Sequence, residues 1–239
     1  MTTRFEDYLG EAEDAYAARP RSALEDVAST HPPSVGLRLE DGGLIGVVLV
    51  RANLSDQRFA ERIQAALSQT FGAAHEDSPT GVDAAEAAEA ALPAPGRAQS
   101  RGDELILRLG ADELLALTAY DAASALAQRL REACAAAPEH AALCENFSDG
   151  FALIKLSGPS AREALAHEAP IDLHPRAFAP GDVRRALVAG VEATLLLRSG
   201  EAEAAEGDKQ PCFEILAPRS QAAALYRRLS RIEVSGDVF

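Results

Sequence analysis

The chain has 239 residues, and its 23 lysines and arginines stand against 37 aspartates and glutamates, which gives a formal net charge of −14 at pH 7. So acidic a protein repels nucleic-acid phosphates and anionic membrane surfaces, and we expect neither as a partner. Hydrophobic residues make up 47% and charged residues 25% of the sequence. This is the composition of an ordinary globular protein, which excludes disorder of the chain as a whole.

The sequence carries no targeting or redox signal. Its longest apolar runs, such as 44–50, fall far short of the roughly 20 residues that a helix needs to cross a bilayer. The acidic start, MTTRFED, lacks the basic and apolar regions of a signal peptide. Cys134, Cys144 and Cys212 form no C-x-x-C pair, which argues against a disulfide framework or a zinc site. We therefore expect a reduced, cytoplasmic protein.

The excess acid is concentrated in a few segments. Residues 1–30 form an acidic N-terminal arm, in which Phe5, Tyr8 and Tyr16 recur at helical spacing and predict a short amphipathic helix. Such a helix is not stable alone, so its apolar face is covered either by the rest of the chain or by a partner. We expect two solvated acidic loops, at 73–96 and 199–210.

Hydrophobic periodicity predicts the remaining elements. In the first half we predict a strand at 44–51, a helix at 55–71, strands at 104–109 and 113–118, and a helix at 121–135. In the second half we predict strands at 142–147 and 151–156, a helix that begins at Pro159, strands at 183–189, 191–198 and 212–217, and a closing helix. The paired strands around short polar turns favour hairpins.

The two halves follow a similar order, and their last helices share a local pattern. Ala125-Leu126-x-x-Arg129-Leu130 in one corresponds to Ala224-Leu225-x-x-Arg228-Leu229 in the other. We therefore predict an α+β fold with mixed or antiparallel sheets, in which 31–239 is a single duplicated domain of two related β-α-β-β-α halves, at about 31–137 and 138–239. Neither G-x-G-x-x-G nor a P-loop motif occurs, so a dinucleotide or nucleoside triphosphate site of the usual kind is unsupported.

Two segments carry candidate chemistry. The turn with Gly158, Pro159 and Arg162 either holds an anion at a helix N-terminus or reflects turn geometry alone. In the segment 170–181, Asp172 and His174 stand two residues apart, so the carboxylate either orients the imidazole as in a catalytic pair or the histidine is structural. No nucleophile elbow supplies a partner serine, and the histidines show no metal-ligand spacing.

These segments also carry a family resemblance. The runs Phe147-Ser148-Asp149-Gly150, Leu156-Ser157-Gly158-Pro159-x-Ala161-Arg162 and Pro170-Ile171-Asp172-Leu173-His174-Pro175-Arg176-Ala177-Phe178 closely resemble the gamma subunit of heterotetrameric sarcosine oxidase. The sequence departs from the family pattern at Tyr226, about where the family usually carries tryptophan.

The resemblance implies a fold like the folate-binding domain of the glycine-cleavage aminomethyltransferase. It further implies a non-catalytic structural subunit, without a cofactor of its own, in a complex that demethylates sarcosine or a related N-methyl amino acid and passes the one-carbon unit to tetrahydrofolate. The partners would be alpha, beta and delta subunits, which would hold FAD, FMN, NAD, tetrahydrofolate and zinc. The family-motif or interface residues are then Ser148, Asp149, Gly158, Pro159, Arg162, Asp172, His174, Pro175, Arg176 and Phe178, with Phe5, Tyr8 and Tyr16 of the arm.

Two alternatives stay open. One is a gamma-like subunit of an N-methylglutamate dehydrogenase-type complex. The other is an independent folate-binding one-carbon transferase, in which Asp149 or Asp172 would bind the pterin ring. The folate-dependent iron–sulfur assembly relatives are a poor fit, because none of the three cysteines follows Lys-Gly.

Overall fold

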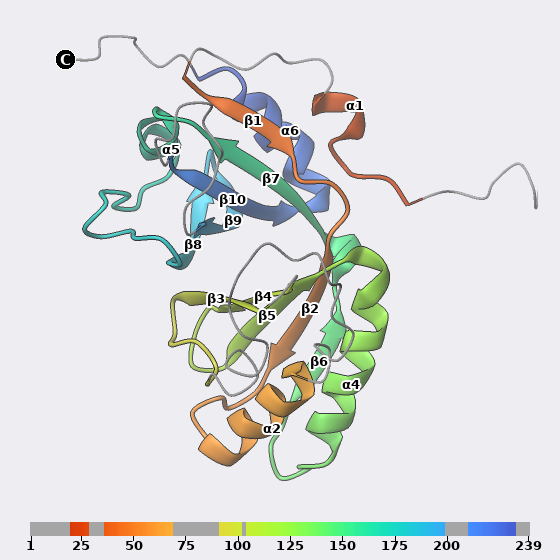
Figure 1. Cartoon of the computed structure of the whole chain (residues 1–239). Helices are drawn as coiled ribbons and strands as arrows, with labels where there is room; N and C mark the ends of the chain where they lie inside the picture. Colours follow the sequence, from red (N-terminus) through yellow and green to blue (C-terminus); the bar gives the residue numbers. More distant parts are fainter. Residues whose placement is uncertain (1–19, 29–35, 69–90, 102–103, 199–209, 233–239) are drawn as a thin grey trace, which may run out of the picture.

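The computed structural model describes residues 20–28, 36–68, 91–101, 104–198 and 210–232 (Figure 1). In the first half the elements are α1 (Glu25–Ala28), β1 (Arg38–Asp41), β2 (Gly46–Arg51), α2 (Gln57–Ser68), β3 (Arg97–Arg101), β4 (Glu104–Arg108), β5 (Glu113–Thr118), the 3₁₀ turn η3 (Tyr120–Ala122) and α4 (Ala123–Ala135). In the second half they are β6 (Leu143–Asn146), η4 (Ser148–Gly150), β7 (Phe151–Ser157), α5 (Ala161–Glu168), β8 (Val183–Val188), β9 (Val191–Leu197), β10 (Cys212–Pro218) and α6 (Arg219–Leu229).

The strands form two five-stranded sheets, which are stacked one above the other in Figure 1. The upper sheet has the order β1-β7-β10-β9-β8, and the lower sheet has the order β3-β4-β5-β2-β6. Every strand pairing between these elements is antiparallel. The predicted α+β class is therefore confirmed, with antiparallel sheets throughout the described residues.

The two halves of the sequence exchange their first strands, so that each half contributes one strand to the sheet formed mainly by the other. β1 belongs to the first half of the sequence but pairs with β7 of the upper sheet, whereas β6 belongs to the second half and pairs with β2 of the lower sheet. When β1 is matched with β6, β2 with β7 and β5 with β10, the two strand orders become the same. This correspondence confirms that the two halves are related. It also means that neither half contains a complete sheet of its own.

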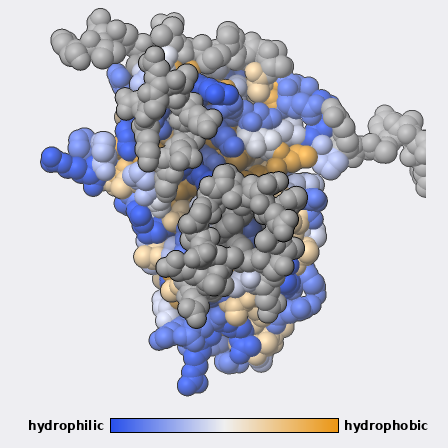
Figure 2. Space-filling view, viewed as in Figure 1, coloured by the Kyte–Doolittle hydropathy of each residue, from blue (hydrophilic) through white to orange (hydrophobic). Residues whose placement is uncertain are grey.

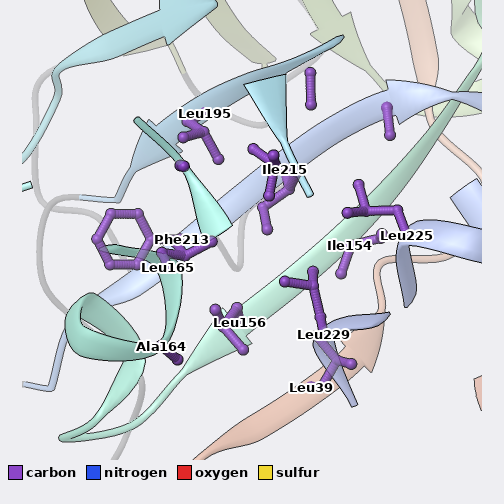
Figure 3. Packing of buried hydrophobic residues seen from close by; sticks show 14 of the residues in the cluster. Leu39, Ile154, Leu156, Ala164, Leu165, Leu195, Phe213, Ile215, Leu225 and Leu229 are labelled. Atoms are coloured by element: carbon purple, nitrogen blue, oxygen red, sulfur yellow. The ribbon is translucent and has the colours of Figure 1, made fainter. Parts of the chain in front are cut away.

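Helices cover the outer face of each sheet, and the inner faces pack against each other. α5 and α6 lie on the upper sheet and α2 and α4 on the lower one (Figure 1). In the upper layer, Leu165 of α5 lies beside Phe213 of β10, and Leu225 of α6 lies beside Ile154 of β7 (Figure 3). The side chains buried between the sheets are Val47, Leu105, Leu107, Leu115, Leu117, Val183, Leu196 and Leu216.

This layering explains the sequence of the central strands. In β4, Leu105 and Leu107 face the other sheet, whereas Ile106 faces the helices of its own layer. A strand buried on both faces reads as a continuous apolar run, without the alternation of a half-exposed strand. On the visible surface, hydrophobic residues recur at the level where the two layers meet (Figure 2).

Hydrogen bonds from two of the outer helices hold the exchanged strands. The hydroxyl of Tyr226 on α6 donates to the carbonyl oxygen of Leu39 on β1 at 3.0 Å, and Tyr226 is 1% exposed. In the other layer, Nε of Arg131 on α4 donates to the carbonyl oxygen of Cys144 on β6 at 3.2 Å. The helices α6 and α4 therefore each fix the strand that comes from the opposite half of the sequence.

Three sequence predictions differ from the structure. β1 and β3 were not predicted, because both are short edge strands with charged or polar sequences, RLED and RAQSR. A hairpin joining 142–147 to 151–156 is wrong, because β6 and β7 lie in different sheets. Their connection is a crossover, in which the Ser148 hydroxyl accepts a hydrogen bond from the Val47 amide at 3.0 Å. The helix predicted to begin at Pro159 begins at Ala161.

An ionic cluster also joins the two layers. The Glu113 carboxylate on β5 accepts hydrogen bonds from Arg51 on β2 at 3.0 Å and from Arg185 on β8 of the upper sheet at 2.5 Å. Burial raises the pKa of Glu113, but the hydrogen bonds and charges of Arg185 and Arg51 outweigh this effect and lower it overall. The folded state therefore stabilises the ionised form of the Glu113 carboxylate.

We predict that Glu113→Gln lowers the free energy of unfolding by about 1–2 kcal/mol near neutral pH, because the arginines that bind Glu113 are partly exposed and solvent weakens their attraction. A carboxyl group with a lowered folded-state pKa contributes fully above its unfolded pKa of roughly 4.3 and loses this contribution as the pH falls through the lowered value. The difference between wild type and variant therefore shrinks towards about pH 3.

Urea unfolding from about pH 7 to about pH 3 measures this effect. Glu192→Gln is the matched control, because Glu192 is 68% exposed and also lies 3.5 Å from the Arg185 guanidinium. Equal losses for the two variants would contradict a special role of Glu113.

Candidate functional site

Among the described residues, no group of three or more histidines, cysteines and acids lies close enough together to hold a metal ion. None of the helices that the structure describes has the length and apolar character to cross a membrane.

Burial raises the pKa of Cys134 and of Cys212, and it raises that of Cys144 to about 12. These thiols are protonated at neutral pH, and Cys134 packs in the core of the lower layer as a small hydrophobe.

Ser148 and Asp149 lie in the crossover η4 between the two layers. The Ser148 side chain is buried and bonds to Asn146 and to the Val47 amide. Asp149 is exposed, and its carboxylate accepts a hydrogen bond from the Tyr120 hydroxyl at 2.8 Å. That hydrogen bond raises the pKa of Tyr120. Both motif residues therefore hold the crossover in place, and Asp149 does not face a buried ring pocket.

Gly158 forms a turn that only glycine fits. Its φ is +122°, and a Cβ atom there would lie 2.4 Å from the carbonyl oxygen of Gly36. Pro159 is exposed, and α5 begins two residues later. The close backbone approach and the positive φ give a geometric reason for this sequence, in agreement with the turn interpretation.

Arg162 on the first turn of α5 binds the loop that follows, rather than a free anion. Its Nη1 atom donates to the carbonyl oxygens of Leu173 at 2.5 Å and Phe178 at 3.1 Å. The guanidinium also lies 5.6 Å from the ring centre of Phe213, and burial lowers its pKa. Because Leu173 and Phe178 are themselves buried, this arginine fixes the loop to the core of the upper layer.

The segment 170–182, here called the motif loop, places its polar residues outside. Asp172, His174, Pro175 and Arg176 are exposed. The Asp172 carboxylate accepts a hydrogen bond from the backbone N–H of His174 at 2.9 Å, so the imidazole is not oriented by the carboxylate. The Nδ1 atom of His174 accepts the backbone N–H of Arg176 at 3.2 Å. The catalytic-pair interpretation is therefore wrong, because both side chains cap backbone amides of their own loop.

The far end of the motif loop is tied to the lower sheet. Asp182 forms an ion pair with Arg97 of β3, and it also accepts the Ala179 amide at 2.7 Å. Nearby, the Ala98 amide donates to the carbonyl oxygen of Gly181 at 2.7 Å. Sequence reasoning missed Arg97 and Asp182, because their pairing joins segments 85 positions apart and leaves no pattern in the local sequence.

The sequence-predicted site residues thus fall into separate places. Arg162 and Phe178 come together around the motif loop, with Asp172, His174, Pro175 and Arg176 on its outside, whereas Ser148 and Asp149 lie at the crossover. The predicted arm residues Phe5, Tyr8 and Tyr16, and most of the acidic loops 73–96 and 199–210, lie outside the described residues.

We predict that Arg162→Met lowers the free energy of unfolding by about 2 kcal/mol, because the buried carbonyls of Leu173 and Phe178 lose their donor while the aliphatic packing is kept. Urea unfolding measures the change, and limited proteolysis reports whether the motif loop opens. Arg227→Met on the exposed face of α6 is the control and should unfold like wild type. Identical unfolding of both variants would show that Arg162 does not anchor the loop.

Comparisons with known proteins agree with this architecture. The model of the sarcosine oxidase, gamma subunit family matches residues 76–206. A chain of the heterotetrameric sarcosine oxidase from Corynebacterium sp. U-96 in complex with pyrrole 2-carboxylate has a similar fold, with a TM-score of 0.63 at 22% identity over 90% of this chain and 99% of that one. The glycine cleavage system aminomethyltransferase T from Bartonella henselae gives a TM-score of 0.54 at 16% identity over 82% of this chain and 46% of that one. A comparison with curated proteins found no match.

The two solved structures establish the fold alone. It is the fold with two related α+β halves that the sequence analysis expects. The family match spans more than half of the chain and includes the crossover and the motif loop. The chain therefore belongs to the sarcosine oxidase gamma subunit family.

Proposed function

We propose that the chain is the gamma-type subunit of a heterotetrameric complex of the sarcosine oxidase kind, and that its role there is structural. One observation carries the structural role: the motif side chains bind their own backbone. Arg162 holds two carbonyls, Asp172 and His174 cap amides of the motif loop, and Ser148 holds the crossover. A catalytic site needs polar groups that face a substrate, whereas these polar groups bind backbone atoms of their own chain.

Family membership supports the proposal of partner subunits. The similar chain from Corynebacterium sp. U-96 comes from a heterotetrameric sarcosine oxidase. We propose by analogy that alpha, beta and delta subunits accompany this chain in the cytoplasm and that they hold FAD, FMN, NAD, tetrahydrofolate and zinc. The complex would oxidatively demethylate sarcosine or a related N-methyl amino acid, such as N-methylglutamate, and transfer the one-carbon unit to tetrahydrofolate.

The independent transferase alternative rests on the fold shared with an aminomethyltransferase. Pterin recognition needs a carboxylate that is buried against the ring and free to accept its N–H groups. Asp149 and Asp172 are both exposed, and each already accepts a hydrogen bond from within the chain. Their surroundings favour the subunit proposal over the transferase.

We predict that the affinity-tagged full-length chain, purified from its own cells under native conditions, elutes with flavin-containing subunits and with amine-oxidising activity. The same tagged chain, expressed alone, should elute without flavin and without this activity, because the reactive groups belong to the partners. Flavin absorbance and turnover of sarcosine and N-methylglutamate are the measurements, and the preferred amine identifies the complex.

Titration of tetrahydrofolate into the chain expressed alone separates the two proposals. The subunit proposal expects no binding below millimolar concentration. Tight folate binding by a chain that elutes without partners would reject the subunit proposal in favour of the transferase.

A further inference from the structure

The motif loop is held in place by contacts at several points along its length. Its inner residues Leu173 and Phe178 are 4% and 0% exposed, and Arg162 bonds to the carbonyl of each. Its far end is tied to the other layer through the ion pair of Asp182 with Arg97. The loop is therefore anchored to both layers of the molecule, while Asp172, His174, Pro175 and Arg176 between these anchors are exposed.

The tip, residues 172–176, is ordered by hydrogen bonds of its own. The Asp172 carboxylate binds the His174 amide, and Nδ1 of His174 binds the Arg176 amide. The carbonyl oxygen of His174 accepts the Ala177 and Phe178 amides at 2.8 and 2.9 Å, and the ring of Pro175 fixes the backbone φ between them. A surface that is already ordered loses little conformational entropy when it binds a partner.

The exposed side chains of His174 and Arg176 at the tip can donate hydrogen bonds. Because Nδ1 of His174 accepts a hydrogen bond, the proton of the neutral ring lies on Nε2, which leaves Nε2–H as a donor. Within the described part of the chain, the Arg176 guanidinium makes no hydrogen bond or ion pair. Arginine presents a planar fork of donors that matches a carboxylate in two parallel hydrogen bonds.

The Arg176 guanidinium is a positive charge on a chain whose net charge is −14. Most of that negative charge lies in the segments 1–30, 73–96 and 199–210, outside the motif loop. The tip carries the imidazole N–H and the arginine two residues apart in sequence, while the Asp172 carboxylate is turned to the His174 amide. Arginine is also enriched among the side chains that contribute most to protein interfaces.

We propose that the tip of the motif loop is a docking point that binds a carboxylate side chain of a partner subunit through Arg176 and His174. This inference rests on the proposed function, because it specifies which surface of the subunit meets its partner and by which chemistry. The buried part of the motif, Leu173, Phe178 and Arg162, then positions the tip without touching the partner. The tip is small compared with the roughly 1,600 Å² of a stable interface, so it is one anchor within a larger contact.

The test uses the purified full-length chain and the partner subunits co-expressed without it. Isothermal titration calorimetry at low and high salt gives the Kd for wild type, for two variants that each remove a donor, for a partial rescue and for a control. Arg176→Gln removes the charge and keeps the backbone N–H that binds His174. His174→Asn keeps a side-chain oxygen that caps the Arg176 amide but lacks the outward imidazole donor. Thermal unfolding confirms that both variants keep the fold.

We expect Arg176→Gln to raise the Kd about tenfold or more and to reduce its salt dependence, because a desolvated charge pair is lost. His174→Asn should raise the Kd by a smaller factor, and Arg176→Lys should restore part of the affinity that glutamine loses. Arg58→Gln, at an exposed arginine of α2 on the other layer, is the matched control and should bind like wild type.

The experiment distinguishes failure of the docking point from failure of the proposed function. If wild type binds the partner subunits and both tip variants bind equally well, the docking point is rejected while the proposed function stands. A weaker Arg176→Gln complex with unchanged salt dependence also rejects it, because the contact is then not ionic. If wild type does not bind the partner subunits at all, the proposed function fails and takes this inference with it.

Discussion

The exchange of first strands is the constraint on which the rest of this structure depends. β1 completes the upper sheet and β6 the lower one, so each half of the sequence must fold together with the other. The Tyr226 hydroxyl bound to the Leu39 carbonyl is a direct consequence, because it ties the last helix to a strand near the start of the chain. An unpaired polar group at that depth would cost about 1–3 kcal/mol, so the exchanged strand is held in one register.

Stacking the two sheets then places the motif loop. The apolar inner faces bring β8 over the lower sheet, where Arg185 meets Glu113 and Asp182 meets Arg97. The loop that leads into β8 is thereby fixed at one end to the lower layer, while Arg162 fixes it to α5 at the other. The Arg162 anchor lies within the upper layer, whereas the Asp182–Arg97 anchor forms only where the two layers meet.

The fold is similar to that of an aminomethyltransferase, and the proposed structural role makes a different use of it. Function belongs to sites carried by a fold and not to the fold itself. Here the polar residues of the family motif are used to hold backbone, and Asp172 and His174, which read as a catalytic pair in sequence, cap neighbouring amides. What the motif presents to its surroundings is a shaped, ordered surface, and this is the property that a subunit needs.

The sequence by itself determined the α+β class, the related halves and most of the strands, because runs such as β4 and β9 are apolar enough to be buried in any arrangement. It also determined the family, through the crossover and motif-loop residues. Only the tertiary structure decided which sheet each strand joins and what Arg162 and Asp172 bind. The edge strand β1 carries just one residue, Leu39, in the core of the upper layer, so its place is set by its neighbours. Pairings between residues far apart in sequence, such as Arg97 with Asp182, leave no local pattern, since they arise only when the two layers meet.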